Sequence, residues 1–282
     1  MDTQSWLMLR ILINRYNPKA GNALLKFLPE EEAAHVLKQD IHSTDIFPLL
    51  AQPKYILELM HYSWLQPIIE AYPHDFQSLL LGVLSHHQTS KLQLSSEKTP
   101  YSVSLPVKNF LIHQLYANFH NEHPLPLDYL PETDMTVLAK LSKNELVDMI
   151  NFLGLHDLTA KIRGIVNKQH LENIYTSLTP KQLRYLKICL YQKEKLDSPP
   201  LDINPAEKNK DKLGSIIHQR GLARLGKALC GEHKDLVWYI VHILDRGRGK
   251  ILQGYYQEQS IPKVTSILRT QVMHVMNFIK KE

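Results

Sequence analysis

The feature that most constrains this sequence is an apolar periodicity of helical type that recurs along the chain. Apolar residues three and four positions apart occur in one stripe at Leu146, Met149, Ile150 and Leu153. A second stripe near the C-terminus consists of Val264, Ile267, Leu268, Val275, Met276 and Ile279. Residues at this spacing share one face of a helix, and no alternating strand pattern competes with them. The sequence therefore predicts an all-α fold.

Helix start signals agree with this prediction and indicate short helices. Capping boxes are predicted at residues 142–145 and 179–182, and Pro180 occupies the first helical position of the second. Pro29 is followed by three glutamates, which the positive end of a helix dipole favours. We expect Gly154 to end a helix. Short helices joined by tight turns favour stacked helical hairpins over a long up-down bundle.

Two stretches without helical periodicity divide the chain. Residues 86–103 are polar and carry no apolar stripe. Residues 197–213 contain three prolines followed by alternating charges, a composition that resists packing and suits a linker or a hinge. We therefore predict an N-terminal helical domain at 1–88, a middle helical domain at 104–196 and a C-terminal helical domain at 214–282.

Positive charge is concentrated in the C-terminal part of the chain. The whole sequence holds 33 Lys+Arg against 28 Asp+Glu, a net charge of +5. Residues 205–282 hold 14 Lys and Arg against 7 Asp and Glu, so this part carries +7 and the rest about −2. A basic surface of this kind is either simply solvated, or it contacts an acidic protein partner or a nucleic acid.

Sequence patterns for catalysis, cofactors and metals are missing. No glycine-rich turn precedes a Lys-Ser or Lys-Thr pair, which disfavours nucleotide chemistry. The 15 histidines include no His-Glu-x-x-His motif, and His86 and His87 adjoin each other in an expected loop. Cys189 and Cys230 lie in apolar helical patterns without metal spacing, which indicates a reducing cytosol. We expect no enzymatic activity, no cofactor and no metal ion.

An internal repeat at an offset of 78 aligns residues 157–168 with residues 235–246. Both segments present Asp, Leu, Ile and Ile in the same order, followed by an Asx and a basic residue. We interpret both as helices whose final Asx caps the next helix, although chance similarity between amphipathic helices is the alternative.

The C-terminal part contains a set of helical elements in a distinctive order. Residues 227–236 read as an apolar helix that ends at Gly231 and is followed by a charged helix start. Residues 245–252 are rich in basic residues, and residues 261–264 mark a turn into a long last helix. This order resembles the C-terminal domain of the FliG family of flagellar motor switch proteins. Residues 24–37 are similar to that family's Leu-Pro-Glu-Glu hairpin, so the resemblance implies an armadillo-like or FliG-like arrangement of stacked short hairpins.

The charged helix of the FliG family carries basic residues near its start and an acidic pair about two turns later. The basic positions have counterparts in Arg246, Arg248 and Lys250, but the acidic pair is missing where Tyr255 and Tyr256 lie. The resemblance thus implies the helical scaffold of the FliG family without the surface of basic and acidic residues through which that family generates torque. The two tyrosines either pack onto the final helix or contact a partner in place of the lost charges.

Two further segments have both a structural and a binding interpretation. Glu122, His123 and Pro124 partly match a Glu-His-Pro-Gln run that contacts FliM in the FliG family, but Pro126 and Pro131 interrupt the helix that should follow, as in an ordinary interdomain turn. The apolar run at residues 61–69 is either a hairpin corner in the core or a docking groove.

A FliG-like scaffold without torque residues suits a non-flagellar type III secretion apparatus, where the SctK class holds the corresponding place. The resemblance implies a non-catalytic adaptor that links a membrane-ring protein like FliF, SctD or SctJ to a FliM/FliN- or SctQ-like protein. An SctL-like stator is a further partner that this resemblance suggests. It implies a multi-copy assembly in the cytoplasm, at the inner face of the bacterial inner membrane. The alternatives are a true flagellar motor switch protein with a torque role, or a basic helical-repeat protein that binds nucleic acid; a nucleic acid is not the expected partner.

Overall fold

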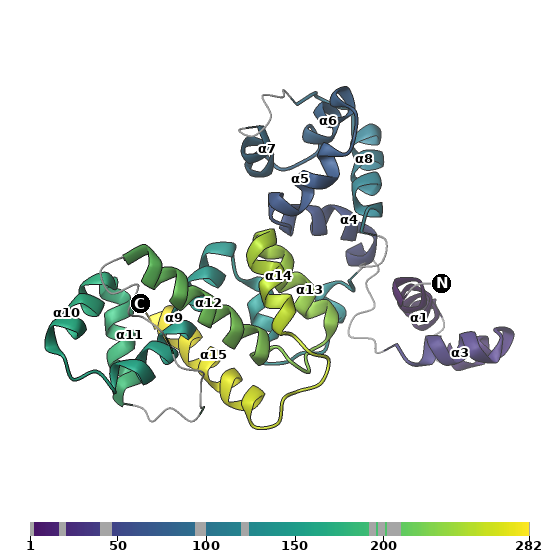
Figure 1. Ribbon diagram of the computed structural model, residues 1–282. Coiled ribbons are helices and arrows are strands. Elements are labelled where there is room, and N and C mark those ends of the chain that lie inside the picture. The colour runs from purple at the N-terminus through teal and green to yellow at the C-terminus, as the bar shows by residue number, and fades with distance from the viewer. Residues whose placement is uncertain are drawn as a thin grey trace. The chain divides into compact units, whose positions relative to one another are not determined.

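The computed structural model of the chain is built from helices (Figure 1). It describes residues 3–16, 21–39, 47–93, 100–119, 124–191, 196, 201 and 210–281. Within these ranges there are α-helices and short 3-10 helices and no strand, which confirms the all-α prediction. The stacked-hairpin arrangement stays a prediction.

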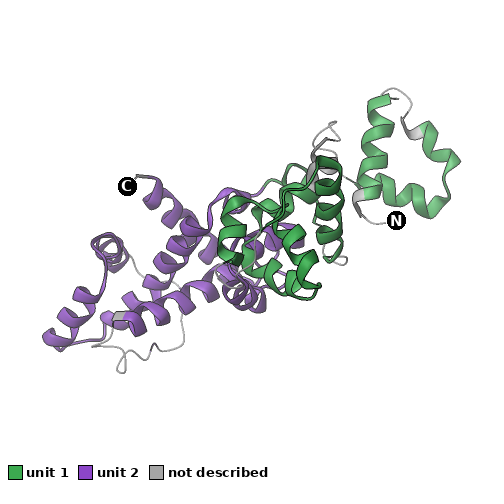
Figure 2. Ribbon diagram, turned by 90° about the horizontal axis from the view of Figure 1, so that it is seen from above, with its two compact units in different colours: residues 1–132 green, residues 133–282 purple. Residues whose placement is uncertain are grey.

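The chain forms two compact units, Met1–Glu132 and Thr133–Glu282 (Figure 2). This division differs from the predicted one, because the predicted middle domain is divided between the units: residues 104–132 belong to unit 1, and residues 133–196 share unit 2 with the predicted C-terminal domain. Within unit 2, α9 (Lys143–Ile162) packs along α12 (Lys210–Ala228). Most of the predicted linker at 197–213 lies outside the described residues; within it, Leu201 is buried and α12 begins at Lys210.

The first part of unit 1 is a small helical cluster. Its elements are α1 (Thr3–Tyr16), α2 (Gly21–Leu24), the 3-10 helix η1 (Leu25–Phe27) and α3 (Glu30–Leu37). These helices share a hydrophobic core of Trp6, Ile13, Leu25 and Val36. Helix α3 begins directly after Pro29 with three glutamates in its first turn, as predicted.

The rest of unit 1 consists of α4 (Phe47–Leu59), α5 (Tyr62–Glu70), α6 (His74–Leu81), α7 (His86–Gln93), α8 (Leu105–Ala117) and η2 (Leu127–Tyr129). Helix α4 packs on α8, and α5 packs on α6 and α7. The apolar run at residues 61–69 forms most of α5. Leu65 and Ile69 are buried there, as the core interpretation predicts, and Pro67 lies inside the helix.

Helix α7 corrects the expectation that residues 86–103 lack helix and that the two adjacent histidines lie in a loop. His86 and His87 begin the helix instead. At the start of this helix Ser85 and Gln88 cap each other, since the Ser85 N–H donates to Gln88 Oε1 over 3.2 Å and the Gln88 N–H donates to the Ser85 hydroxyl over 3.4 Å. The buried Gln88 also bonds to another helix. Its side-chain amide donates to the carbonyl oxygens of Leu57 (2.6 Å) and Met60 (2.8 Å), at the end of α4. These tertiary hydrogen bonds satisfy carbonyls that the end of a helix leaves without partners.

The described residues of unit 2 form the 3-10 helix η3 (Thr136–Lys140) and seven α-helices. Besides α9 and α12, these are α10 (Lys168–Ser177), α11 (Pro180–Tyr191), α13 (Lys234–Ile243), α14 (Arg246–Tyr255) and α15 (Val264–Lys281). Helix α12 is central to the unit, since it packs against α9, α14 and α15 (Figure 1). Helix α11 packs on α9, and α13 packs on α14 and η3.

Both predicted capping boxes in unit 2 are formed. The Ser142 hydroxyl accepts from the Glu145 backbone N–H (3.3 Å), and the Glu145 carboxylate accepts from the Ser142 N–H (2.7 Å). Hydrogen bonds to the Glu145 carboxylate from the Ser142 backbone N–H, and secondly from the Ser142 side chain, lower the pKa of Glu145. At the start of α11, Thr179 and Gln182 make the same reciprocal pair, at 2.9 and 3.2 Å.

Gly154 does not end a helix, because α9 continues through it to Ile162. A Cβ atom at Gly154 would lie 1.9 Å from the Ile217 carbonyl oxygen of α12. The contact is reciprocal, since a Cβ at Gly221 of α12 would lie 1.8 Å from the Ile150 carbonyl oxygen of α9. The two glycines allow the backbones of α9 and α12 to approach each other closely.

The proposed internal repeat is not a repeat of equivalent elements. Asp157 lies in the interior of α9, whereas Asp235 lies in the first turn of α13. The expected caps do occur: Asn167 accepts from the His170 N–H at the start of α10, and Asp245 caps α14. The shared pattern therefore reflects helix amphipathicity and capping rather than one repeated hairpin.

Candidate docking surface on the C-terminal unit

The three basic residues predicted to contact a partner all lie on α14, but they differ in exposure. Arg246 and Lys250 are exposed and lie one helical turn apart on the outer side of the helix. Arg248 is half-buried. The predicted basic surface is therefore made by two of the three residues.

Arg248 connects α14 to the interior of unit 2. It forms an ion pair with Asp245, and its Nε donates to His218 Nε2 of α12 over 2.8 Å. The other ring nitrogen of His218, Nδ1, lies 2.7 Å from Asn151 Oδ1 of α9. His218 thus accepts from Arg248 and donates to Asn151, which requires the neutral imidazole. This chain of hydrogen bonds anchors α14 to α12 and α9.

The charges along this chain shift the pKa values of its members. Burial and the Arg248 guanidinium lower the pKa of His218, although the nearby Asp245 acts in the opposite direction. Burial would raise the pKa of Asp245, but hydrogen bonds from Arg248 and the charges of Arg248 and Lys143 outweigh it and lower that pKa. At neutral pH the network therefore holds an ionised aspartate and a neutral histidine.

Two apolar side chains lie beside the exposed cations of α14. Ile251 is 45% exposed and Tyr255 is 40% exposed. The Tyr255 side chain packs over Gly226 of α12, where an added Cβ would lie 2.6 Å from Tyr255 Cβ. We call the set formed by Arg246, Lys250, Ile251 and Tyr255 the α14 face. It combines two positive charges with an aliphatic and an aromatic side chain.

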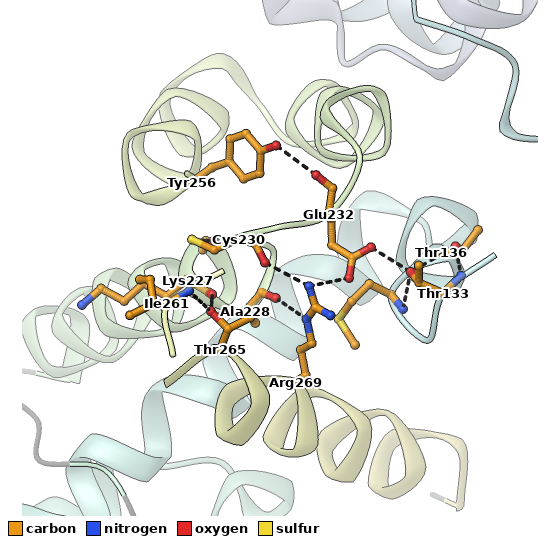
Figure 3. Close-up of polar contacts among 12 residues, drawn as sticks. Thr133, Thr136, Lys227, Ala228, Cys230, Glu232, Tyr256, Ile261, Thr265 and Arg269 are labelled. Carbon is orange, nitrogen blue, oxygen red and sulfur yellow. Dashed lines mark hydrogen bonds and ion pairs between the residues drawn. The ribbon is translucent and has the colours of Figure 1, made fainter. Parts of the chain in front are cut away.

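Tyr256 has a structural role. It is half-buried, and its hydroxyl donates to the Glu232 carbonyl oxygen over 3.0 Å (Figure 3). Burial and several nearby acidic groups, first among them Glu258, raise its pKa. The described contacts of Tyr255 and Tyr256 involve α12 and the turn after it, whereas the sequence left open packing onto the final helix or contact with a partner.

The Glu232 carboxylate is the centre of a polar cluster that the sequence did not indicate (Figure 3). It is 3% exposed, lies 2.6 Å from Arg269 Nη2 of α15, and accepts from the Thr133 hydroxyl over 2.8 Å. Arg269 also donates to the carbonyl oxygens of Ala228 (3.0 Å) and Cys230 (2.9 Å). Arg269 therefore satisfies the carbonyls at the end of α12 and joins this end to α15.

A second buried ion pair lies in the interior of unit 2. Arg224 of α12 donates to Asp157 Oδ1 of α9 through Nη2 (2.5 Å) and Nε (3.2 Å), and both side chains are nearly completely buried. Its Nη1 donates to Gln271 Oε1 of α15 over 2.6 Å. One guanidinium thus connects the three central helices. These charged residues are structural, and they hold the elements that carry the α14 face.

The predicted FliM-like contact at residues 122–124 is only partly within the described chain. Glu122 and His123 lie outside the described residues, and Pro124 is buried. The short 3-10 helix η2 follows in place of the α-helix that the FliG family has there. The described part of this segment thus belongs to the packed end of unit 1.

Two further properties bear on function. In the part of the chain that the structure describes, no group of three or more His, Cys, Asp or Glu side chains is arranged to hold a metal ion. None of the described helices combines the length and apolar character needed to cross a membrane.

Comparison with models of known protein families, with curated proteins and with solved structures finds no match. The resemblance to the FliG family thus stays a prediction that depends on the order of its sequence motifs.

Proposed function

We propose that this protein is a non-catalytic adaptor of a type III secretion or flagellar basal apparatus, which links a membrane-ring protein to a FliM/FliN- or SctQ-like complex. The observation that carries the proposal is the α14 face, on which Arg246 and Lys250 lie one turn apart beside Ile251 and Tyr255. This helix occupies the place of the charged helix in the sequence resemblance. An SctL-like stator is a further candidate partner.

The chemistry of the α14 face suits an acidic protein surface. Two exposed cations steer an acidic partner and select against a basic one, while Ile251 and Tyr255 supply apolar area that excludes water from the contact.

The support beneath α14 favours a rigid docking platform. Arg248 and Asp245 fix the first turn of the helix, and His218 extends this connection to α9. A surface that is ordered before binding loses less conformational entropy on association.

The experiment is crosslinking and affinity purification of the tagged full-length protein from its native cell, followed by mass spectrometry. We expect a ring subunit and a FliM/FliN- or SctQ-like protein to copurify, and the double variant Arg246→Glu/Lys250→Glu to lose the second of these. The matched control is Lys234→Glu, which reverses an exposed charge on α13. Both variants should retain the unfolding temperature of the parent. Recovery of neither partner class with the parent protein would contradict the proposal.

The net charge of unit 2 favours nucleic-acid binding as a second candidate. Residues 133–282 hold 24 Lys and Arg against 15 Asp and Glu, a net charge of +9. Binding through about six phosphate contacts would weaken by roughly 10³-fold between 50 and 200 mM salt. Substitution of Arg246 and Lys250 by alanine would remove part of this nucleic-acid binding. A titration with labelled single- and double-stranded nucleic acids at both salt concentrations distinguishes this candidate from the adaptor.

A torque role in a flagellar motor is a variant of the same proposal. It predicts that the protein restores motility to a cell that lacks its own switch protein. The missing acidic pair at Tyr255 and Tyr256 favours the adaptor without torque.

A further inference from the structure

Helix α11 carries a second surface with the same chemistry as the α14 face. Its outer side presents Arg184, Lys187, Ile188 and Tyr191, which are all exposed and spaced as i, i+3, i+4 and i+7. Ile188 is 43% exposed and Tyr191 is 93% exposed. The helix contains no acidic residue, and Lys181 adds a third cation in its first turn. We call the four exposed residues the α11 stripe.

The inner side of α11 is firmly packed. Tyr185, Leu186 and Cys189 are buried, and the Tyr185 hydroxyl lies 3.1 Å from His156 Nε2 of α9. The rings of Tyr185 and Phe152 meet edge to face at 5.3 Å. The helix that carries the stripe is therefore held in one orientation by its opposite side.

A positively charged side chain also holds the C-terminal end of α11 in place. Arg163, at the end of α9, donates through Nη2 to the carbonyl oxygens of Cys189 and Leu190, each over 3.1 Å. A guanidinium at this position offsets the negative end of the helix dipole. It thus adds to the positive potential around Tyr191 without occupying the exposed stripe.

The α11 stripe and the α14 face share an arrangement. Each has a Lys-Ile pair, Lys187-Ile188 or Lys250-Ile251, with an arginine about one turn before it and a tyrosine about one turn after it. In both helices all four side chains reach the surface. Arginine and tyrosine are among the residues enriched at the energetic centres of protein interfaces. Two separate helices of unit 2 thus present one recognition chemistry.

We infer that the α11 stripe binds an acidic amphipathic helix of a protein partner. A helix with an apolar stripe flanked by carboxylates would place that stripe along Ile188 and Tyr191 and its acids against Arg184 and Lys187. A single-stranded nucleic acid is less well matched, because it needs a series of aromatic platforms and the stripe places an aliphatic side chain at its centre. This inference rests on the proposed adaptor function, and it gives the adaptor two acidic-helix sites on one unit.

The test uses a synthetic probe, a fluorescent helical peptide about three heptads long with leucine at the core positions and glutamate beside them. A control peptide has the same composition with the leucines scrambled, so it keeps the charge and loses the apolar stripe. Binding to the full-length protein is measured by anisotropy, and its stoichiometry by titration calorimetry. Four proteins are compared: the parent, Arg184→Glu/Lys187→Glu, Arg246→Glu/Lys250→Glu, and the combination of both pairs.

We expect the parent to bind two probe molecules, each double variant one, and the combined variant none. In the Arg246→Glu/Lys250→Glu background, only the α11 stripe is left to bind. There Tyr191→Ser should weaken binding about tenfold, which corresponds to about 1.4 kcal/mol, and Lys234→Glu should change it less than twofold. The scrambled peptide should bind at least about tenfold more weakly than the probe in the same background.

Several outcomes would overturn the inference, and they differ from failure of the proposed function. If the Arg246→Glu/Lys250→Glu protein no longer binds the probe while the parent does, the α14 face is a site and the α11 stripe is not. If that protein binds probe and scrambled peptide equally, the stripe is only a basic surface. If an oligouridine displaces the probe at lower concentration than unlabelled probe does, the occupant is a nucleic acid. If sedimentation shows that the parent self-associates and Arg184→Glu/Lys187→Glu does not, the occupant is a second copy of this chain.

Discussion

The two units of this protein satisfy their buried polar groups in different ways. Among the described residues of unit 1, the buried polar side chains are neutral: Gln77, Ser78, Gln88 and Thr89. Gln77, Gln88 and Thr89 donate to backbone carbonyls of neighbouring turns. Unit 2 instead buries the charged side chains of Asp157, Arg224 and Glu232, which connect different helices. The interior of unit 1 thus depends on neutral side chains that donate to backbone carbonyls, and that of unit 2 on ionic connections between helices.

The two units also differ in net charge. Residues 1–132 hold 9 Lys and Arg against 13 Asp and Glu, a net charge of −4, whereas unit 2 carries +9. Charge in unit 2 is used both inside, where it positions helices, and outside, where it forms the two proposed docking surfaces. Substitutions that remove a buried charge should therefore act more strongly in unit 2 than any polar substitution in unit 1. We expect each compact unit to unfold in a transition of its own, so calorimetry of the full chain allows the comparison.

The largest effect is expected for Asp157→Ala in unit 2. This change leaves the Arg224 guanidinium buried without its counter-charge, which typically costs about 3–5 kcal/mol of unfolding free energy. The unit 2 transition should move to lower temperature while the unit 1 transition stays in place. The double variant Asp157→Leu/Arg224→Met removes both charges and should be more stable than the single variant. Equal destabilisation of both transitions would contradict the proposed difference between the interiors of the two units.

The next effect in size is expected for Gly221→Ala. The added Cβ would meet the Ile150 backbone oxygen at 1.8 Å, so α9 and α12 must separate, at a cost of about 3 kcal/mol. Gly214→Ala is the matched control, because an added Cβ there touches nothing, and it should stabilise the same helix slightly. Chemical denaturation of both variants measures the difference. Similar stability of the two would show that α9 and α12 are not held at this close approach.

A smaller effect is expected for Gln88→Ala in unit 1. The substitution leaves the carbonyl oxygens of Leu57 and Met60 without their buried donor, which costs about 1–3 kcal/mol. Ser90→Ala, on the same helix, removes only an exposed hydrogen bond and serves as control. The unit 1 transition should shift for Gln88→Ala alone. A loss as large as that of Asp157→Ala would contradict the distinction between neutral and ionic interiors.

The smallest effect is the pH dependence that His218 gives to unit 2. Because its pKa is lowered in the folded chain, the unfolded chain binds a proton at this residue first as the pH falls below about 6.5. Unit 2 should therefore lose stability below that pH, down to the lower pKa of the folded state. His218→Asn keeps a hydrogen-bonding side chain without titration and should remove this component. Unfolding of both proteins between pH 7.5 and about 5 measures it, and an unchanged profile would assign the dependence elsewhere.

Local signals in the sequence predicted helices and caps well. Ser142 and Thr179 begin helices where their capping boxes indicated, because a capping box needs only residues three positions apart. Helix α7 was missed because its segment has no apolar stripe, although Ser85 and Gln88 cap its start and hydrogen bonds from Gln88 join it to α4. Gly154 was interpreted as a local stop, but it is a point of contact with a helix that is distant in sequence.

The candidate docking surface was predicted in part. Arg246 and Lys250 are exposed as expected, whereas Arg248 is held by Asp245 and His218, a connection that no local pattern indicates. The α11 stripe was overlooked even though its i, i+3, i+4, i+7 spacing is present in the sequence. A search for basic and aromatic residues at helical spacing, and not only for apolar ones, would have found it.

The order of residues alone specifies the helical class, the starts of helices such as α3, α9, α11 and α14, and the concentration of positive charge in the C-terminal part. These properties arise from spacing and capping over one or two helical turns, which the order of residues specifies directly. Only the tertiary structure decided that residues 133–282 form one unit around α12, and which charges are buried between helices. The reason is that close backbone contacts and ion pairs join residues far apart in the chain, and their partners are defined only when the helices have packed.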